Sequence, residues 1–174
     1  MKKILVVVDM QKDFVDGALG SKEAVAIVPN VVNKIKDFEG DIFVTYDTHF
    51  ENYMDTNEGK NLPVPHCIKG TDGWELNEEV AKALVNRKYT PVEKITFGSV
   101  DLPGLVGKAA GDEAFTVELV GLCTDICVVS NALLLKANFP EMNILVDAAC
   151  CAGVTVESHE AALTTMKMCQ IEVK

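Results

Sequence analysis

Short apolar runs alternate with longer amphipathic stretches along the whole chain. The short runs have the length and the β-branched composition of strands, and some are almost continuously apolar, which indicates burial on both faces of a parallel sheet. The expected strands are residues 4–8, 42–46, 90–95, 115–121 and 143–148, with a short last strand within 170–173.

Between the strands, apolar residues recur near the 3.6-residue spacing of an amphipathic helix. These helices are expected at residues 23–38, 73–84, 101–111, 125–139 and 155–169. Pro29 lies inside the first of them, where it should either kink the helix or mark its true start.

The alternation of strand and helix predicts one α/β domain that spans residues 1–174. We expect a Rossmann-like, three-layer arrangement, with helices on both faces of a mostly parallel sheet of about five to six strands and right-handed crossovers. Residues 47–73 interrupt the pattern with a long polar stretch that has no clear periodicity. Loops of this length in compact domains are usually functional.

The composition argues against some classes of protein, such as membrane proteins and nucleic-acid-binding proteins. The 174 residues are 48% apolar, which suffices for one well-buried core. No apolar run approaches the ~20 residues of a membrane helix, and Asp9 ends the first run too early for an export signal. We therefore expect a cytoplasmic protein without a membrane partner. The net charge is −10 and the 16 Lys and Arg are scattered, which argues against nucleic acid as a partner.

Polar residues stand where the expected strands end. Asp9 ends the first strand, Asp47 ends the second, Lys94 lies near the end of the third, and Cys127 follows the fourth. Open parallel sheets bind their ligands outside the carboxyl ends of the strands. These four side chains are therefore expected to face one crevice.

Cys127 is the candidate nucleophile. With Thr124 or Asp125 as the N-cap, it falls in the first turn of a helix, where the helix N-terminus and a nearby lysine favour thiolate over thiol. The free backbone N–H groups of that turn offer an oxyanion hole. Lys94 needs a partner in its apolar strand, for which Asp9 is the natural choice. Asp9 would then pass the thiol proton to a departing amine while Lys94 holds the thiolate charge.

The spacing of Cys123 and Cys127 has other interpretations. Redox pairs prefer two intervening residues, and a zinc site would need further Cys or His residues close by. We therefore interpret Cys123 as an inert thiol in the turn, and Cys150, Cys151 and Cys169 as small core residues. Free thiols are expected throughout, because the chain shows no export signal.

A second cluster is expected in and beside the polar stretch. Asp47 and His49 lie two residues apart at a strand end and hence on the same face. In the loop, His66 follows the rigid stretch from Pro63 to Pro65, and Glu58 lies between His49 and His66 in the sequence. Two carboxylates and two imidazoles suit Zn²⁺ first, with Mn²⁺ or Fe²⁺ as alternatives. The remaining histidine, His159, is expected to have a structural role.

Several stretches of the chain together form a known pattern. They are VVDMQKDFVDGALG, YDTH, HCIKGTDGWEL, VEKITFGS, GLCTDICVVSNAL and AGVTVESHEAAL. In this order and at these separations they resemble the isochorismatase-like cysteine hydrolases over essentially the whole chain. The polar loop is similar to that of the nicotinamidases, which convert nicotinamide to nicotinate and ammonia in NAD salvage.

The resemblance implies a catalytic centre. Asp9, Lys94 and Cys127 would form the catalytic triad, and the backbone N–H groups of Cys123 and Cys127 would form the oxyanion hole. It also implies a cis peptide bond between Leu122 and Cys123.

The resemblance further implies how a substrate is held. Phe14 would pack on the substrate ring and Phe97 would line the pocket, while the metal would bind the pyridine nitrogen. A tryptophan that often sandwiches the ring in nicotinamidases is replaced here by Leu62, Val64 or a neighbour. The resemblance is compatible with a homo-oligomer. The implied metal ligands are Asp47, His49, Glu58 and His66.

The leading hypothesis is an amidase that acts through a thioester on a small-molecule amide, with nicotinamide as the first choice. The alternative is a metal-independent relative that hydrolyses isochorismate, an N-carbamoyl compound or another small amide with the same triad. A catalytically silent α/β partner or metal-storage domain is the third interpretation. Metal content and ammonia release from a panel of small amides distinguish the three.

Overall fold

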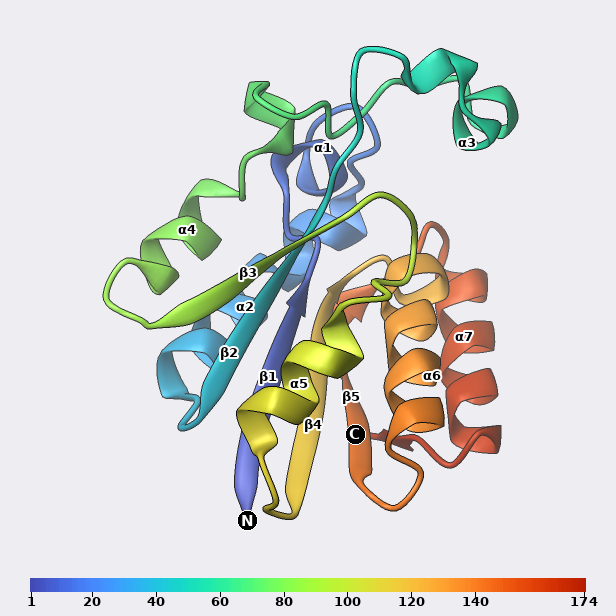
Figure 1. Ribbon diagram of the computed structural model, residues 1–174. Coiled ribbons are helices and arrows are strands. Elements are labelled where there is room, and N and C mark those ends of the chain that lie inside the picture. Colours follow the sequence, from blue (N-terminus) through green and yellow to red (C-terminus); the bar gives the residue numbers. More distant parts are fainter.

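The computed structural model describes residues 1–174 and contains one six-stranded sheet, in which every strand pair is parallel (Figure 1). The strands are β1 (Lys2–Val8), β2 (Asp41–Asp47), β3 (Tyr89–Lys94), β4 (Phe115–Leu122), β5 (Asn143–Ala152) and β6 (Glu172–Val173). Their order is β3-β2-β1-β4-β5-β6, the Rossmann order, which changes direction between β1 and β4. The expected α/β sheet is confirmed, and it is wholly rather than mostly parallel.

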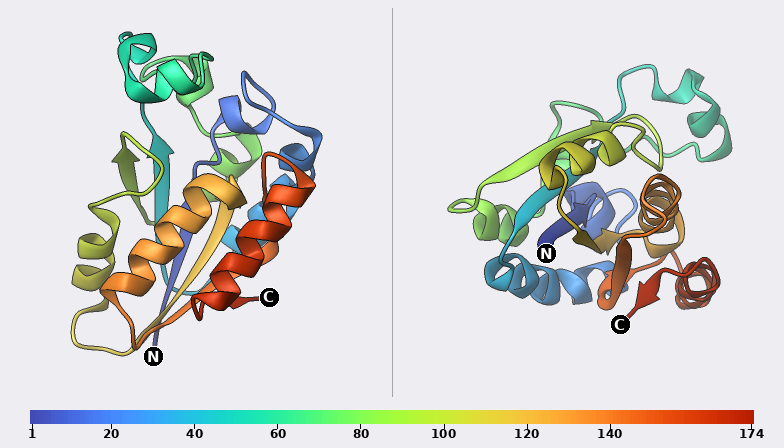
Figure 2. Two further views of the ribbon diagram at one scale, coloured as in Figure 1. Left: turned by 90° about the vertical axis from the view of Figure 1, so that its right-hand side faces the viewer. Right: turned by 60° about the horizontal axis from the view of Figure 1, so that its bottom comes forward.

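Helices cover both faces of the sheet (Figures 1 and 2). Alternate side chains of β1 enter two separate cores: Leu5 and Val7 pack in one, and Ile4, Val6 and Val8 in the other. The first core includes α2 (Lys22–Asp37) and α4 (Glu78–Leu84), and the second includes α5 (Leu102–Ala110), α6 (Val129–Asn138) and α7 (Val156–Met168). None of these helices is both long enough and apolar enough to cross a bilayer.

The helix α2 continues on both sides of Pro29, so the expectation that this proline might mark the start of the helix is wrong. The helix begins after Ser21, whose hydroxyl accepts a hydrogen bond from the N–H of Ala24 at 3.0 Å. Pro29 lies on the exposed side. The buried stripe of α2 packs on the sheet without it, and this tertiary packing compensates for the missing backbone hydrogen bond.

Two short helices lie beyond the carboxyl ends of the strands, at the top of Figure 1. The first, α1 (Lys12–Val15), directly follows the end of β1. The second, α3 (Asn57–Asn61), interrupts the polar stretch and is capped by the Thr56 hydroxyl, which accepts from the Gly59 N–H at 3.0 Å. A helix this short has no apolar periodicity, which explains why the sequence pattern does not reveal it.

The cysteines are all free thiols, as expected. Cys150 and Cys151 are buried near the end of β5, which confirms their assignment to the core. Cys169 is exposed, so its assignment to the core is wrong. It follows the last residue of α7, where the chain leaves the helix and turns towards β6.

The strand ends of β1 and β4 are held together by a close approach at Gly121. This residue has a φ of +119°, and a Cβ atom built on it would lie 2.1 Å from the carbonyl oxygen of Val8. Only glycine fits there. Val8 pairs with Gly121, so the approach also fixes the residues that follow each strand, Asp9 and Cys123 among them.

Replacing Gly121 by alanine should therefore lower the free energy of unfolding by about 3 kcal/mol, because the methyl group meets the Val8 carbonyl in a left-handed backbone. Gly104 provides the matched control, since a Cβ there, in the first turn of α5, meets nothing within 4 Å. Gly104→Ala should raise the free energy by up to about 1 kcal/mol. Urea unfolding of both variants measures the contrast, and equal effects would contradict it.

Candidate active site

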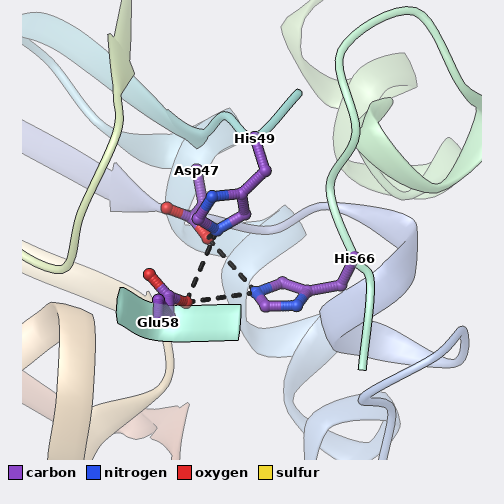
Figure 3. Close-up of side chains that lie close together, drawn as sticks. All are labelled: Asp47, His49, Glu58 and His66. Carbon is purple, nitrogen blue, oxygen red and sulfur yellow. Dashed lines mark hydrogen bonds and ion pairs between the residues drawn. The ribbon is translucent and has the colours of Figure 1, made fainter. Parts of the chain in front are cut away.

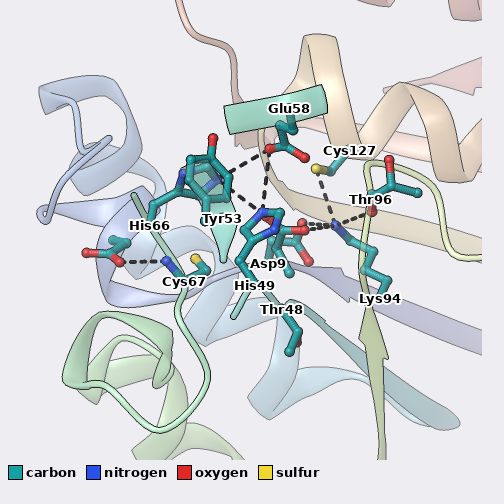
Figure 4. A network of polar contacts seen from close by, with 12 residues as sticks. Asp9, Thr48, His49, Tyr53, Glu58, His66, Cys67, Lys94, Thr96 and Cys127 are labelled. Carbon is teal, nitrogen blue, oxygen red and sulfur yellow. Dashed lines mark hydrogen bonds and ion pairs between the residues drawn. The ribbon is translucent and has the colours of Figure 1, made fainter. Parts of the chain in front are cut away.

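The three strand-end residues expected to act together lie in contact (Figure 4). The Lys94 Nζ atom is 2.7 Å from Asp9 Oδ2 and donates to Cys127 Sγ at 3.5 Å. It also donates to the Thr96 carbonyl at 3.1 Å. Asp9 is 0% exposed, and Lys94 and Cys127 are each 4% exposed. An acid, an amine and a thiol thus share one dry site at the carboxyl edge of the sheet.

A fourth strand-end residue, Asp47, joins this group. Asp47 and Lys94 are neighbours in the register of β2 and β3, and Lys94 Nζ donates to Asp47 Oδ1 at 3.2 Å. Burial acts to lower the pKa of Lys94, but the charges of Asp9 and Asp47 and a hydrogen bond with Asp9 outweigh it and hold the pKa above its ordinary value. Lys94 is therefore a permanent cation. Burial raises the pKa of Asp9, and Lys94 offsets only part of that rise.

The thiol of Cys127 differs from the sequence-based expectation. Burial and the neighbouring charge of Asp9 raise its pKa well above the ordinary value, and Lys94 only partly opposes them. The expectation of a resting thiolate is wrong, because Cys127 is buried and a carboxylate lies beside its sulfur. Cys127 rests as a thiol and must lose its proton during any reaction.

The turn that carries Cys127 also differs from the expected helix start. Residues Thr124–Val128 form a π-helical turn, in which the Val128 N–H donates to the Cys123 carbonyl at 3.0 Å. The N-cap is Cys123 rather than Thr124 or Asp125, because this wider turn begins one residue earlier. The peptide bond between Leu122 and Cys123 is cis, as the resemblance implies.

The second expected cluster is also assembled, and its side chains point toward one another (Figure 3). His49 Nε2 lies 2.9 Å from Asp47 Oδ2 and 3.5 Å from Glu58 Oε1. His66 Nε2 lies 3.6 Å from each of these carboxylate oxygens. Asp47 ends β2, Glu58 lies in α3, and both histidines stand in the loops around them. The four donor atoms lie within 4.8 Å of one another.

This donor set fits a divalent metal ion. Four ligands about 2.0–2.2 Å from a tetrahedral zinc would lie about 3.3 Å apart, close to the observed separations. Two carboxylates balance the charge of such an ion. The other ring nitrogen of His66, Nδ1, lies 2.8 Å from the Val64 carbonyl, the kind of second contact that fixes the orientation of a ligating histidine.

The charges within the cluster are strongly coupled. Burial opposes ionisation of Asp47, but hydrogen bonds with His49 and His66 and the charge of Lys94 hold its pKa below the ordinary value. Burial also opposes the charging of His49, yet its hydrogen bonds with Asp47 and Glu58 raise its pKa to about 9. Without a metal ion, His49 therefore carries a proton at neutral pH, and an ion must displace that proton.

A cavity of about 570 Å³ joins the two clusters. Cys127 and Cys123 line one side of it, and the metal-site residues line another. Phe14 and Phe97 both contribute to the wall, as does Leu62, whereas Val64 does not. The Phe14 ring also meets the His66 ring edge to face at 5.4 Å. No lysine or arginine lines the cavity. Its full lining is Phe14, Ala18, Leu19, Gly20, Ser21, Ala24, Asp47, Glu58, Leu62, His66, Phe97, Leu122, Cys123, Ile126, Cys127, Gly153 and Val154.

Buried polar residues that the sequence analysis does not single out position the acidic groups. The Thr45 hydroxyl donates to Asp9 Oδ1 at 2.6 Å. The Gln11 side chain accepts from the Asp47 N–H at 2.8 Å and donates to the Asp47 carbonyl and to the Trp74 carbonyl, both at 2.9 Å. A threonine in an otherwise apolar strand is the signal that could have identified Thr45. Gln11 has no such signal, because its partners are distant in the sequence.

Asn131 performs a similar task on the other side of the site. This residue is 0% exposed in α6, and its amide donates to the carbonyls of Cys127 and Phe97 at 2.8 and 3.1 Å. Its oxygen accepts from the Ser99 N–H at 2.9 Å. The loop that carries Phe97 is thus tied to the turn that carries Cys127. An amide on the buried side of an apolar helix is the sequence signal for such a role.

A parallel sheet with a buried cysteine, lysine and aspartate at its carboxyl edge is typical of an α/β protein that binds a small ligand at that edge. The isochorismatase domain matches residues 3–173, and the chain belongs to the isochorismatase family. The uncharacterised isochorismatase family protein PncA of Bacillus subtilis (strain 168) is 30% identical over 174 positions, which cover 94% of this chain and 93% of that protein. The resemblance found in the sequence is thus confirmed.

Solved structures of nicotinamidases superpose on nearly the whole chain. Nicotinamidase/pyrazinamidase PncA from Bacillus subtilis has a TM-score of 0.85 and 28% identity, with 99% of each chain covered. The pyrazinamidase/nicotinamidase of Streptococcus mutans UA159 has a TM-score of 0.86 and 28% identity, with coverage of 99% and 100%. The pyrazinamidase of Pyrococcus horikoshii, solved in complex with zinc, has a TM-score of 0.80 and 27% identity, with coverage of 100% and 99%.

Binding of a zinc ion at pH 7 should release about one proton, because His49 is protonated before it becomes a ligand. Protons compete with the ion below the pKa of about 9, so the apparent affinity should fall up to about tenfold for each pH unit of acidification. Calorimetry at pH 6, 7 and 8, in buffers of different ionisation enthalpy, counts the protons. Release near zero in the wild type, or unchanged release in His49→Gln, would exclude His49 as the protonated ligand.

Proposed function

We propose that residues 1–174 form one hydrolase domain that deamidates nicotinamide to nicotinate and ammonia through a thioester on Cys127. The observation that carries the proposal is the contact of Asp9, Lys94 and Cys127 in one buried site, next to a four-donor metal cluster on the same cavity. The family membership and the likeness to nicotinamidases support it.

In the first half of the reaction, Cys127 attacks the carboxamide carbon. Asp9 takes the thiol proton as the S–C bond forms, and Lys94 balances the negative charge of the site. The negative oxygen of the tetrahedral intermediate accepts hydrogen bonds from the N–H groups of Cys123 and Cys127, and each such donor is worth about 3 kcal/mol. The Cys123 N–H is available, because it donates to no backbone carbonyl of the protein. Collapse breaks the C–N bond, and Asp9 returns the proton to the leaving nitrogen, which departs as ammonia.

In the second half, water attacks the carbonyl carbon of the thioester. Asp9, now ionised again, accepts a proton from that water, and the same backbone N–H groups hold the second oxyanion. Breakage of the C–S bond regenerates the Cys127 thiol with the proton from Asp9 and frees the carboxylic acid. The raised pKa of Asp9 suits it to accept and return a proton in this way.

The cavity favours an uncharged ring amide over the alternative substrate isochorismate. Isochorismate is a dianion, and the cavity offers it two carboxylates and neither lysine nor arginine. Phe14 and Phe97 would hold an aromatic ring, and Leu62 would occupy the place of the tryptophan found in many nicotinamidases. A divalent ion held by Asp47, His49, Glu58 and His66, zinc first, would supply a Lewis acid for the pyridine nitrogen.

The nucleophile is tested by Cys127→Ala. Ammonia release from nicotinamide should fall by at least about 10³-fold, because Cys127 is the cysteine whose sulfur contacts Lys94. Bound metal, measured by elemental analysis, should be unchanged. Cys151→Ala is the matched control, since Cys151 is also 4% exposed but lies outside the cavity lining. Wild-type activity in Cys127→Ala would refute the proposal.

The role of the metal is tested by its removal. Dialysis against a chelator should lower ammonia release about tenfold or more, and one equivalent of Zn²⁺, Mn²⁺ or Fe²⁺ should restore it. His49→Ala should resist restoration by any of the three ions. Full activity of the stripped wild type would instead support the metal-independent alternative, and a panel of N-carbamoyl compounds and small amides would then identify the substrate.

A further inference from the structure

The turn that carries the proposed oxyanion donors and the nucleophile is fastened to α7 by side-chain contacts. The Thr124 hydroxyl lies 2.7 Å from Nδ1 of His159, and Thr124 is 0% exposed. One residue later, both carboxylate oxygens of Asp125 accept from the Val154 N–H at 3.2 Å. The turn is thus held at two consecutive residues, by the first turn of α7 and by the segment just before that helix.

The fold brings His159 to this position with little freedom. The helix α7 starts with a capping box, in which the Thr155 hydroxyl accepts from the Ser158 N–H and the Ser158 hydroxyl accepts from the Thr155 N–H. His159 follows within the first turn. A Cβ atom on Gly153 would lie 2.9 Å from both the N and the Cβ of His159, so the start of α7 packs directly on the end of β5.

The contact between Thr124 and His159 serves no other evident structural purpose. His159 lies outside the metal cluster and is absent from the cavity lining. The Thr124 hydroxyl makes no other hydrogen bond, and a buried hydroxyl that loses its partner is costly. Loss of the imidazole would therefore release the turn at Thr124, between the two residues whose N–H groups would hold the oxyanion.

We propose that His159 is a positioning residue for the reaction, which acts through Thr124 on the backbone N–H groups of Cys123 and Cys127. This inference rests on the proposed function. Most of the cavity lining and all four metal donors come from other segments, so loss of the contact should change substrate binding little. Oxyanion donors act in the transition state, so their misplacement lowers kcat and leaves KM unchanged.

The test compares His159→Ala with His159→Asn and His159→Gln. An asparagine amide can take the place of Nδ1, whereas a glutamine amide reaches the place of Nε2. We expect His159→Ala and His159→Gln to lower kcat for nicotinamide about 10- to 100-fold with KM within about twofold. His159→Asn should recover most of the loss. The control is Glu160→Ala, an exposed neighbour on α7 that should keep wild-type kcat.

A mutant cycle separates positioning from general damage to the fold. Thr124→Val keeps the shape and removes the hydroxyl, so the double variant with His159→Ala should be no slower than either single variant. Each variant should remain folded at the assay temperature, which its thermal unfolding curve measures. A kcat for His159→Ala within twofold of the wild type, additive losses in the cycle, or a rise in KM that accounts for the loss would each overturn the inference.

A readout that needs no substrate distinguishes this inference from the proposed function. The rate at which iodoacetamide alkylates Cys127, followed by peptide mass spectrometry, should rise several-fold in His159→Ala and return toward wild type in His159→Asn, because a released turn exposes the sulfur. If the wild type releases no ammonia from nicotinamide, the proposed function fails. Equal alkylation rates in all variants would refute the positioning role itself.

Discussion

The Lys94 ammonium lies out of contact with water, held by Asp9 and Asp47 and touching the sulfur of Cys127. A buried charge is tolerated only when its partners surround it, so these four groups need one another. Each comes from the end of a different strand or from the turn that follows it. The parallel register of β3, β2, β1 and β4 is what brings them together, and the close approach at Gly121 keeps the last two strands in place. The strand order and register of the sheet therefore determine which charged groups meet at the site.

Asp47 extends this constraint to the polar loop. One of its oxygens accepts from Lys94 and the other lies close to both histidines, so a single carboxylate belongs both to the group of Asp9, Lys94 and Cys127 and to the four-donor cluster. The Gln11 side chain forms hydrogen bonds with both the N–H and the carbonyl of Asp47, and with the carbonyl of Trp74. The loop that supplies Glu58 and His66 is therefore organised from β2 outward, and it closes the cavity over the cysteine.

Sequence patterns predict the features of this structure that depend on residues close together in the chain. The ends of the expected strands identify Asp9, Asp47, Lys94 and Cys127, and the spacing of residues identifies the histidines. A polar residue at such a place must either have a partner or face solvent. The ionisation state of Cys127 could not be predicted, since it depends on the depth of burial and on the carboxylate beside it. Contacts such as those of Gln11 and Thr124 could not be predicted either, because their partners lie far away in the sequence.

The lack of lysine and arginine in the cavity lining also bears on how a cycle would end. Hydrolysis of a neutral amide would create an anion in a space that offers it no free cationic side chain, because Asp47 and Glu58 would balance the divalent ion and the buried Lys94 ammonium is already paired with its own acids. The product acid would therefore bind more weakly than the neutral amide. Release of the product would be favoured over its rebinding, and such an enzyme would stay active while the product acid accumulates in solution.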